Sequence, residues 1–165
     1  MWIRCCSSSA LKGRAYEATV ERVLEKYGCT LAATAVSMDG GIDHFGTWTF
    51  PDGLKMEIAT QCKHEEKAVG VTYFREFEGV LGKIPNTIGV FASASGYSLY
   101  AKRFFVQMTQ PAIRLTIRED DGIVEFDMNP PARRLLPKLV PGSMFLDDAH
   151  ILVLTYDGNV LEKDD

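Results

Sequence analysis

The sequence feature that most constrains the fold is a turn signal between two runs of strand-forming residues. Pro51-Asp52-Gly53 has the residue types that favour a tight turn, and it lies between residues 42–50 and 54–63. Both runs carry aromatic or β-branched residues, which favour extended chain. The sequence therefore predicts a β-hairpin that brings the start of the first strand beside the end of the second.

Further elements follow from hydrophobic periodicity. Apolar residues at helical spacing predict helices over 13–27, 70–84 and 97–108. Shorter apolar runs predict strands over 29–36, 87–92 and 113–118. With the hairpin, the order is α-β-β-β-α-β-α-β, which predicts an α/β fold with a mixed sheet flanked by helices.

The last part of the chain has weaker signals. A short strand over 123–126 precedes a proline-rich passage, and 151–156 and 160–161 flank the turn residues Asp157-Gly158-Asn159 as a closing hairpin. The chain has 165 residues, which suits one domain. We expect a core over 1–118 and a C-terminal extension over 119–165 packed on the same domain.

Composition narrows the class of protein. The net charge of −4 argues against a protein that coats nucleic acid by bulk charge, although a local basic groove stays compatible with it. No apolar run approaches the length of a membrane span, so we expect no membrane partner. The four cysteines include no C-x-x-C pair, which favours reduced thiols and an intracellular location.

The first sixteen residues contain Arg4, Lys12, Arg14 and a serine run, and no acid precedes Glu17. This composition is compatible with a mitochondrial targeting segment. A mitochondrial location is therefore one alternative within the intracellular class.

Asp43 is unusual because aspartate is disfavoured in strands. The predicted hairpin places it beside Gln61 and Lys63, which point to one face of the second strand because they alternate with Cys62. The alternative is that 39–41 form a turn and Asp43 caps a backbone N–H. Glu17 lies near the apolar stripe of the first helix, where it is either a site residue or a first-turn acid favoured by the helix dipole.

These side chains suit phosphodiester cleavage. Oxygen ligands from Asp43, Gln61 and the carbonyl of Cys62 would hold Mg²⁺ or Mn²⁺, and Lys63 would orient or deprotonate the attacking water. Glu17 would hold a metal-bound water. Cys62 and His64 also suggest zinc, but the sequence offers no further ligands at zinc-site spacing, which disfavours it.

The same residues resemble the Mrr-like branch of the PD-(D/E)xK nuclease superfamily. The resemblance rests on Gly13-x-x-Tyr16-Glu17, on DGGID at 39–43 and on QCK at 61–63. It continues through Val69-Gly70, 75–81 and 89–104, and it spans about residues 13 to 117. Within the branch, DGGIDHFGTW and QCK are similar to fungal mitochondrial proteins required for respiratory growth.

The resemblance implies a restriction-endonuclease-like core with Asp43, Gln61, Lys63 and Glu17 as catalytic residues, a divalent metal and DNA as the partner. His44 departs from the family pattern, which prefers an apolar residue there. It is either a phosphate contact or an edge residue. The expected contacts to nucleic acid, which are otherwise ordinary solvated surface residues, are Lys12, Arg14, His44, His64, Lys67, Lys102 and Arg103.

The leading hypothesis is a metal-dependent DNA endonuclease that acts on modified or foreign duplex or on branched DNA, and that forms a homodimer because two cuts require two sites. The first alternative is a non-catalytic nucleic-acid-binding module that retains the fold. A third reading, a small-molecule metalloenzyme, would use Asp39, Asp43 and His44.

Overall fold

The computed structural model describes residues 9–35 and 41–162. Its centre is a six-stranded sheet in which the strands are neighbours in chain order. The strands are β1 (Cys29–Ala33), β2 (His44–Thr49), β3 (Lys55–Lys63), β4 (Thr87–Ser93), β5 (Ala112–Arg118) and β6 (Gly122–Met128).

The predicted hairpin is confirmed. Strands β2 and β3 pair antiparallel, with Trp48 opposite Met56 and His44 opposite Thr60. Strands β3, β4 and β5 are parallel to one another, and the outer pairs are antiparallel. The sheet is therefore mixed, with parallel strands at its centre, where burial on both faces is the rule.

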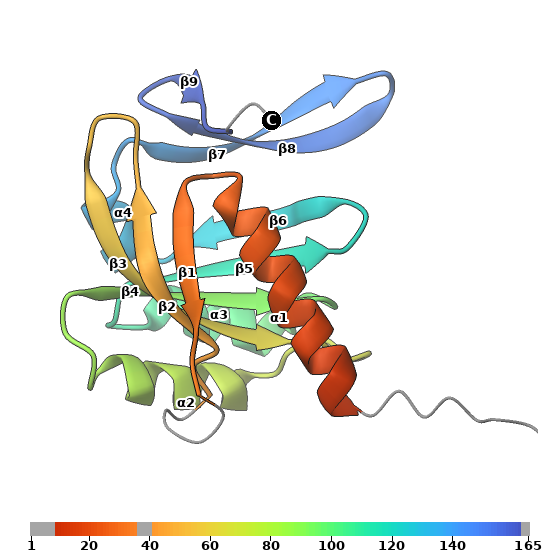
Figure 1. Cartoon of the computed structure of the whole chain (residues 1–165), viewed down its shortest axis with the longest axis vertical. Coiled ribbons are helices and arrows are strands. Elements are labelled where there is room, and N and C mark those ends of the chain that lie inside the picture. The colour runs from red at the N-terminus through yellow and green to blue at the C-terminus, as the bar shows by residue number, and fades with distance from the viewer. Residues whose placement is uncertain (1–8, 36–40, 163–165) are drawn as a thin grey trace, which may run out of the picture.

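Helices cover both faces of this sheet (Figure 1). Helix α1 (Ser9–Glu25) crosses one face, and α2 (Val71–Leu81) and α3 (Leu99–Gln107) lie together on the other. The predicted order of helices and strands through β5 is confirmed.

Each face has its own hydrophobic core. On the α1 face, Tyr16, Val20 and Leu24 recur at helical spacing and pack against the sheet. On the other face, Phe74 of α2 packs against Phe105 of α3, with 5.5 Å between ring centroids. Fully burying such aromatic side chains contributes about 1.5–3 kcal/mol each, so the two cores hold the sheet between the helices.

The first helix begins earlier than the periodicity predicts. Helix α1 starts at Ser9, whereas the expected helix starts at Gly13. Glycine is a poor helix former, so its presence favours a later start. The helix nevertheless continues through Gly13, and its extra turn carries Lys12 to the end of the sheet where the candidate site lies.

The chain beyond residue 118 contains more structure than the sequence indicates. Strand β6 pairs with β5 and so extends the first sheet. Helix α4 (Pro130–Leu135) and strand β7 (Leu139–Leu146) both lie in the proline-rich passage. Prolines fit the first turn of a helix, and the Asn129 side chain caps α4 by accepting a hydrogen bond from the Ala132 amide at 3.1 Å.

A second, three-stranded sheet closes the α1 face. It contains β7, β8 (Ala149–Tyr156) and β9 (Asn159–Val160), and the β8–β9 pair is the predicted closing hairpin. Tyr156 stacks on Phe50 with 4.7 Å between ring centroids. Its hydroxyl donates to the Asp52 carboxylate at 2.9 Å, so the second sheet contacts the turn of the first hairpin.

Gly46 of β2 provides a test of this packing. A Cβ at this position would lie 2.0 Å from the backbone oxygen of Thr30 on β1. We expect Gly46→Ala to lower the free energy of unfolding by about 3 kcal/mol, because overpacking of this kind cannot be relieved by a side-chain rotation. Urea unfolding followed by circular dichroism measures the change.

Gly79→Ala is the matched control. Gly79 is exposed on α2 and has open space around its Cα. Alanine is favoured over glycine in helices by about 1 kcal/mol, so this variant should be as stable as the wild type or more stable. Equal losses in the two variants would contradict the assigned β1–β2 register.

Candidate active site

The candidate site lies where the parallel strands end. Strands β3, β4 and β5 end at Lys63, Ser93 and Arg118, and because they are parallel these ends lie at one edge of the sheet. Asp43 directly precedes β2, which runs antiparallel to β3, so it lies at the same edge. Ligand sites of open α/β sheets typically lie at such edges.

Asp43 is fixed by the backbone of β3. Its own amide donates to the Thr60 carbonyl at 2.8 Å. Its carboxylate oxygen Oδ2 accepts a hydrogen bond from the Cys62 amide at 2.7 Å. The carboxylate therefore caps a backbone N–H, as the alternative reading expected, and this contact also aims it at the end of β3.

Glu17 of α1 faces this carboxylate. Burial raises the pKa of Glu17, and its charge repulsion and hydrogen bond with Asp43 raise it further. Burial also raises the pKa of Asp43, and the Cys62 N–H and nearby His44 only partly offset this effect. Two carboxyl groups that disfavour each other's charge form a site that a cation stabilises.

Gln61 contributes a neutral oxygen to the same place. Its side chain is 5 % exposed, and its Oε1 has no hydrogen-bond partner among the residues that the structure describes. Such a buried, unpaired oxygen costs about 1–3 kcal/mol unless a ligand satisfies it. Gly41, which has a φ of +99°, makes room: a Cβ there would lie 2.8 Å from Gln61 Nε2.

Cys62 acts through its backbone. Burial raises the pKa of its thiol well above the ordinary value, and the carboxylates of Asp43 and Glu17 raise it further, so the thiol stays protonated. The Cys62 amide points toward Asp43. In a strand, the N–H and C=O of one residue point to the same side, so we expect its carbonyl to face Asp43 as well.

The donor set fits a hard divalent cation. No three His, Cys, Asp or Glu side chains group as a metal site within residues 9–35 and 41–162. The available donors are the oxygens of Asp43, Glu17, Gln61 and the Cys62 carbonyl, which suit Mg²⁺ or Mn²⁺ and not zinc. The orphaned Gln61 Oε1 is the observation that supports this fit.

Lys63 is held near the same edge by an aromatic ring. Its Nζ lies 4.7 Å from the centroid of the Tyr73 ring, within cation–π range. The Tyr73 hydroxyl donates to Glu65 at 2.9 Å, which fixes the ring. Lys63 also contributes to lowering the pKa of Asp43, so its charge acts at the carboxylate site.

His44 is not the surface residue that a phosphate contact requires. It is 1 % exposed, its Nδ1 lies 2.6 Å from Thr60 Oγ1, and its Nε2 lies 3.8 Å from the Glu21 carboxylate. Burial lowers the pKa of His44 more than the two nearby carboxylates raise it. The expectation of a direct DNA contact is corrected: β2 pairing turns this ring toward α1. The Asp39 of the metalloenzyme reading lies outside the described residues.

The other basic residues lie in two groups. Lys12 and Arg14 are exposed on α1, and His64 and Lys67 are exposed on the segment after β3. Lys102 and Arg103 belong to α3, on the opposite face of the sheet (Figure 1), and Lys102 pairs with Glu125 at 3.5 Å. The structure therefore does not gather all six on one face, and the α3 pair stays a prediction.

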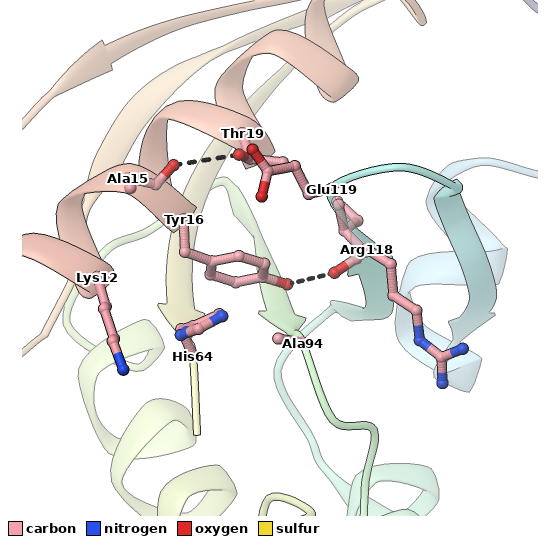
Figure 2. A pocket seen from close by; sticks show the side chains of 9 residues that line it. Lys12, Ala15, Tyr16, Thr19, His64, Ala94, Arg118 and Glu119 are labelled. Carbon is pink, nitrogen blue, oxygen red and sulfur yellow. Dashed lines mark hydrogen bonds between the residues drawn. The ribbon is translucent and has the colours of Figure 1, made fainter. Parts of the chain in front are cut away.

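A pocket beside the carboxylates includes residues that the sequence analysis did not single out for binding. Figure 2 shows Lys12 and His64 on one side of Tyr16, and Arg118 and Glu119 on the other. Arg118 ends β5, and its position at the carboxyl end of a predicted parallel strand is the signal that could have identified it.

Asp43→Asn tests the carboxyl pair. The amide keeps an acceptor for the Cys62 N–H and removes one charge, so in EDTA at pH 7.5 the variant should melt a few degrees above the wild type. Because the folded pKa of Asp43 is raised, the wild type gains stability as the pH falls through it. The difference in melting temperature between the variant and the wild type should therefore shrink as the pH falls, and it should be smallest below 3.8, the ordinary pKa of an aspartate.

Asp52→Asn is the control with the opposite sign. Its pKa is lowered, first by the Leu54 amide and also by Lys138 and Tyr156. This variant should melt below the wild type at pH 7.5, and the loss should fade as the pH falls through the folded pKa. Destabilisation of Asp43→Asn at pH 7.5 would contradict a repelling carboxyl pair.

Comparisons with known proteins identify the family of this chain. A restriction endonuclease family model, Mrr_cat, matches residues 8–120. An uncharacterized mitochondrial protein of Schizosaccharomyces pombe is 26% identical over 95 residues, which are 56% of this chain and 38% of that protein. This chain therefore spans well under half the length of that curated relative.

Two solved restriction endonucleases are similar. MspJI in complex with a 27-mer oligonucleotide is 18% identical over 64% of this chain and 26% of its own, with a TM-score of 0.49. The DNA modification-dependent AspBHI is 22% identical over 61% of this chain and 27% of its own, with a TM-score of 0.48. Because the Mrr_cat model covers more than half of the sequence, the chain belongs to this restriction endonuclease family, which supports a DNA nuclease.

Proposed function

We propose that the protein is a metal-dependent DNA endonuclease that hydrolyses phosphodiester bonds at the edge formed by Asp43, Gln61 and Lys63. The observation that carries the proposal is the unpaired, buried Oε1 of Gln61, the residue before the Cys62 amide that binds Asp43. The carboxyl groups of Asp43 and Glu17 both have raised pKa values. A cluster of oxygen donors that repel one another lowers the free energy of unfolding, but it suits the binding of a divalent cation.

In this proposal Asp43, Gln61 and the Cys62 carbonyl hold Mg²⁺ or Mn²⁺, and Glu17 holds a water beside them. When bound, the metal stabilises the charge that develops on the scissile phosphate and lowers the pKa of a bound water. Gln61 is neutral and therefore a weaker ligand than an acid. Asp43, which the Cys62 amide orients, supplies the main charge.

Lys63 acts on the attacking water. Its Nζ lies over the Tyr73 ring at the carboxylate edge, where the ammonium form orients the attacking water and attracts the phosphate, and the neutral amine form accepts the proton of the water. Tyr73 is a positioning residue here, since Glu65 fixes its hydroxyl and its ring limits where the lysine reaches.

The exposed cations of α1 and of the segment after β3 are the proposed DNA contacts near the site. They would track the backbone, which positions a duplex without reading its sequence. The substrate is modified or foreign duplex or branched DNA, and a homodimer would cut both strands. We propose an intracellular location, in mitochondria, because one relative is named as a mitochondrial protein. No helix in the described ranges is long and apolar enough to span a bilayer.

A non-catalytic DNA-binding module is the second candidate. The neutral Gln61 ligand favours it, because a weaker metal site supports slower hydrolysis. Its DNA binding would not need the metal, whereas cleavage would.

Cleavage of labelled DNA tests the proposal. The substrates are linear duplex, supercoiled plasmid, flap and four-way junction, each with Mg²⁺, Mn²⁺ or EDTA. We expect metal-dependent products from the wild type and a loss of about 10²–10⁴-fold in rate for Asp43→Ala and for Lys63→Ala, since each removes a group that acts on the reacting atoms.

Metal binding is measured separately. Titration calorimetry with Mn²⁺ should detect a site in the wild type that Asp43→Ala abolishes and Gln61→Glu strengthens, because an acid replaces a neutral ligand. Lys83→Ala, an exposed lysine after α2, is the control and should change neither readout. Tight metal-independent DNA binding without cleavage of any substrate would contradict the endonuclease and support the non-catalytic binding module.

A further inference from the structure

The pocket between α1 and the strand ends has a volume of about 420 Å³. Its walls include Lys12, Tyr16 and Thr19 of α1, His64 after β3, and Arg118 and Glu119 at the end of β5 (Figure 2). Volumes of about 300–1,000 Å³ are typical of small-molecule sites, so the pocket has the size for a single nucleotide.

We propose that this pocket binds one unpaired nucleotide of the DNA strand that is cut. The inference rests on the proposed function and names its substrate class: DNA with an unpaired nucleotide beside the scissile phosphodiester, as in a flap, a gap or a strand end. Continuous duplex is then the poorer substrate.

The pocket is continuous in sequence with the candidate active site. Tyr16 precedes Glu17 on α1, and His64 follows Lys63 at the end of β3. Tyr16 belongs to the same hydrophobic cluster as Cys62, and its ring packs against His64, so it lies beside the end of the strand that carries the proposed metal ligands. Because Tyr16 and His64 adjoin Glu17 and Lys63 in the chain, a nucleotide in the pocket would lie at the same end of the sheet as the carboxylates.

Three basic side chains provide charge for the phosphate. Lys12, His64 and Arg118 form no ion pair with any residue in the described ranges. Lysine and arginine that lack a carboxylate partner and line a concave wall suit a phosphate, to which arginine can donate two hydrogen bonds at once.

Other groups favour a nucleoside over a bare anion. Tyr16 is held in place because its hydroxyl donates to the Ile117 carbonyl at 3.0 Å. The exposed His64 ring packs against the buried Tyr16 ring, with 5.2 Å between centroids and a tilt of 42°, so the His64 ring is supported on one side and available for a base to stack on. The Glu119 carboxylate would repel inorganic phosphate but would accept a hydrogen bond from a base N–H or a sugar hydroxyl.

The shape of the pocket selects an unpaired nucleotide. It is bounded by a helix and by strand ends, so a base must leave its pair and its stack to enter. Extruding a nucleotide from duplex costs a few kcal/mol and least where it is already unpaired. The pocket therefore favours DNA that has a free nucleotide next to the cut.

Binding is tested first without metal, so that it does not depend on cleavage. The protein in EDTA is titrated with thymidine monophosphate, thymidine and inorganic phosphate and followed by NMR chemical shifts. We expect the monophosphate to bind most tightly. Lys12→Ala and Arg118→Ala should each weaken it about tenfold, which is the effect of losing one charge-assisted hydrogen bond.

Two further variants separate the roles of the side chains. Lys26→Ala removes an exposed lysine from the turn that follows α1 and that does not line this pocket, and it should bind like the wild type. His64→Phe should retain nucleotide binding better than His64→Ala, because phenylalanine keeps the surface for stacking and loses only the polar nitrogens.

Cleavage then links the pocket to the substrate class. With Mg²⁺ the wild type should cut a flapped or gapped substrate about tenfold faster than the matched duplex, and Arg118→Ala should reduce that preference. Monophosphate that binds no better than inorganic phosphate, or equally well to the Lys12 and Arg118 variants, would overturn the inference. Nucleotide binding without cleavage of any DNA would instead reject the endonuclease and leave the pocket assignment standing.

Discussion

The hydrogen bond from the Cys62 amide to the Asp43 carboxylate is the contact on which the candidate site depends. It joins two strands at the point where their regular pairing stops at His44 and Thr60. One interaction thereby orients the acid, keeps the end of β3 extended and brings Gln61 and Lys63 to the same edge. Without it, the backbone hydrogen bond from the Asp43 amide to the Thr60 carbonyl would still join the segments, but the carboxylate would lose its orientation. The hydrogen bond from Cys62 to Asp43 therefore fixes both the geometry of the candidate site and the local fold.

The position of the site follows from how the sheet is buried. Helices cover both faces, so the central strands are apolar along most of their length, and Phe91 and Leu115 are fully buried. Apolar side chains fill most of both faces, and the polar groups of the candidate site gather at the edge where the parallel strands end. At that edge the protein carries an unpaired amide oxygen and two mutually repelling carboxyl groups. Functional sites commonly lower the free energy of unfolding in this way, and burial of the two hydrophobic cores offsets that loss.

The sequence predicts much of this arrangement and misses parts of it for physical reasons. Turn residues and alternation identify the hairpin, and with it the nearness of Asp43 to Gln61. The burial of His44 depends on its register opposite Thr60 and on Glu21 of a separate helix, which no local pattern encodes. Helix α4 and β7 lie among prolines, which normally interrupt secondary structure. The Asn129 side chain caps α4 and so allows this helix to form at Pro130. Asp39 and Gly40 of the predicted motif lie outside the described residues.

The contact of Tyr156 with Phe50 and Asp52 has a consequence for how the molecule is made. The hydroxyl of Tyr156 reaches back across 104 positions to the turn of the first hairpin. Leu139, Leu154 and Tyr156 belong to the same core as α1, so in the segment that matches the family model α1 covers only part of that face. During synthesis, Phe50 and its neighbours lack their packing partners and stay exposed until β8 has left the ribosome. During that interval the exposed aromatic surface is a binding site for chaperones and a route to misassembly.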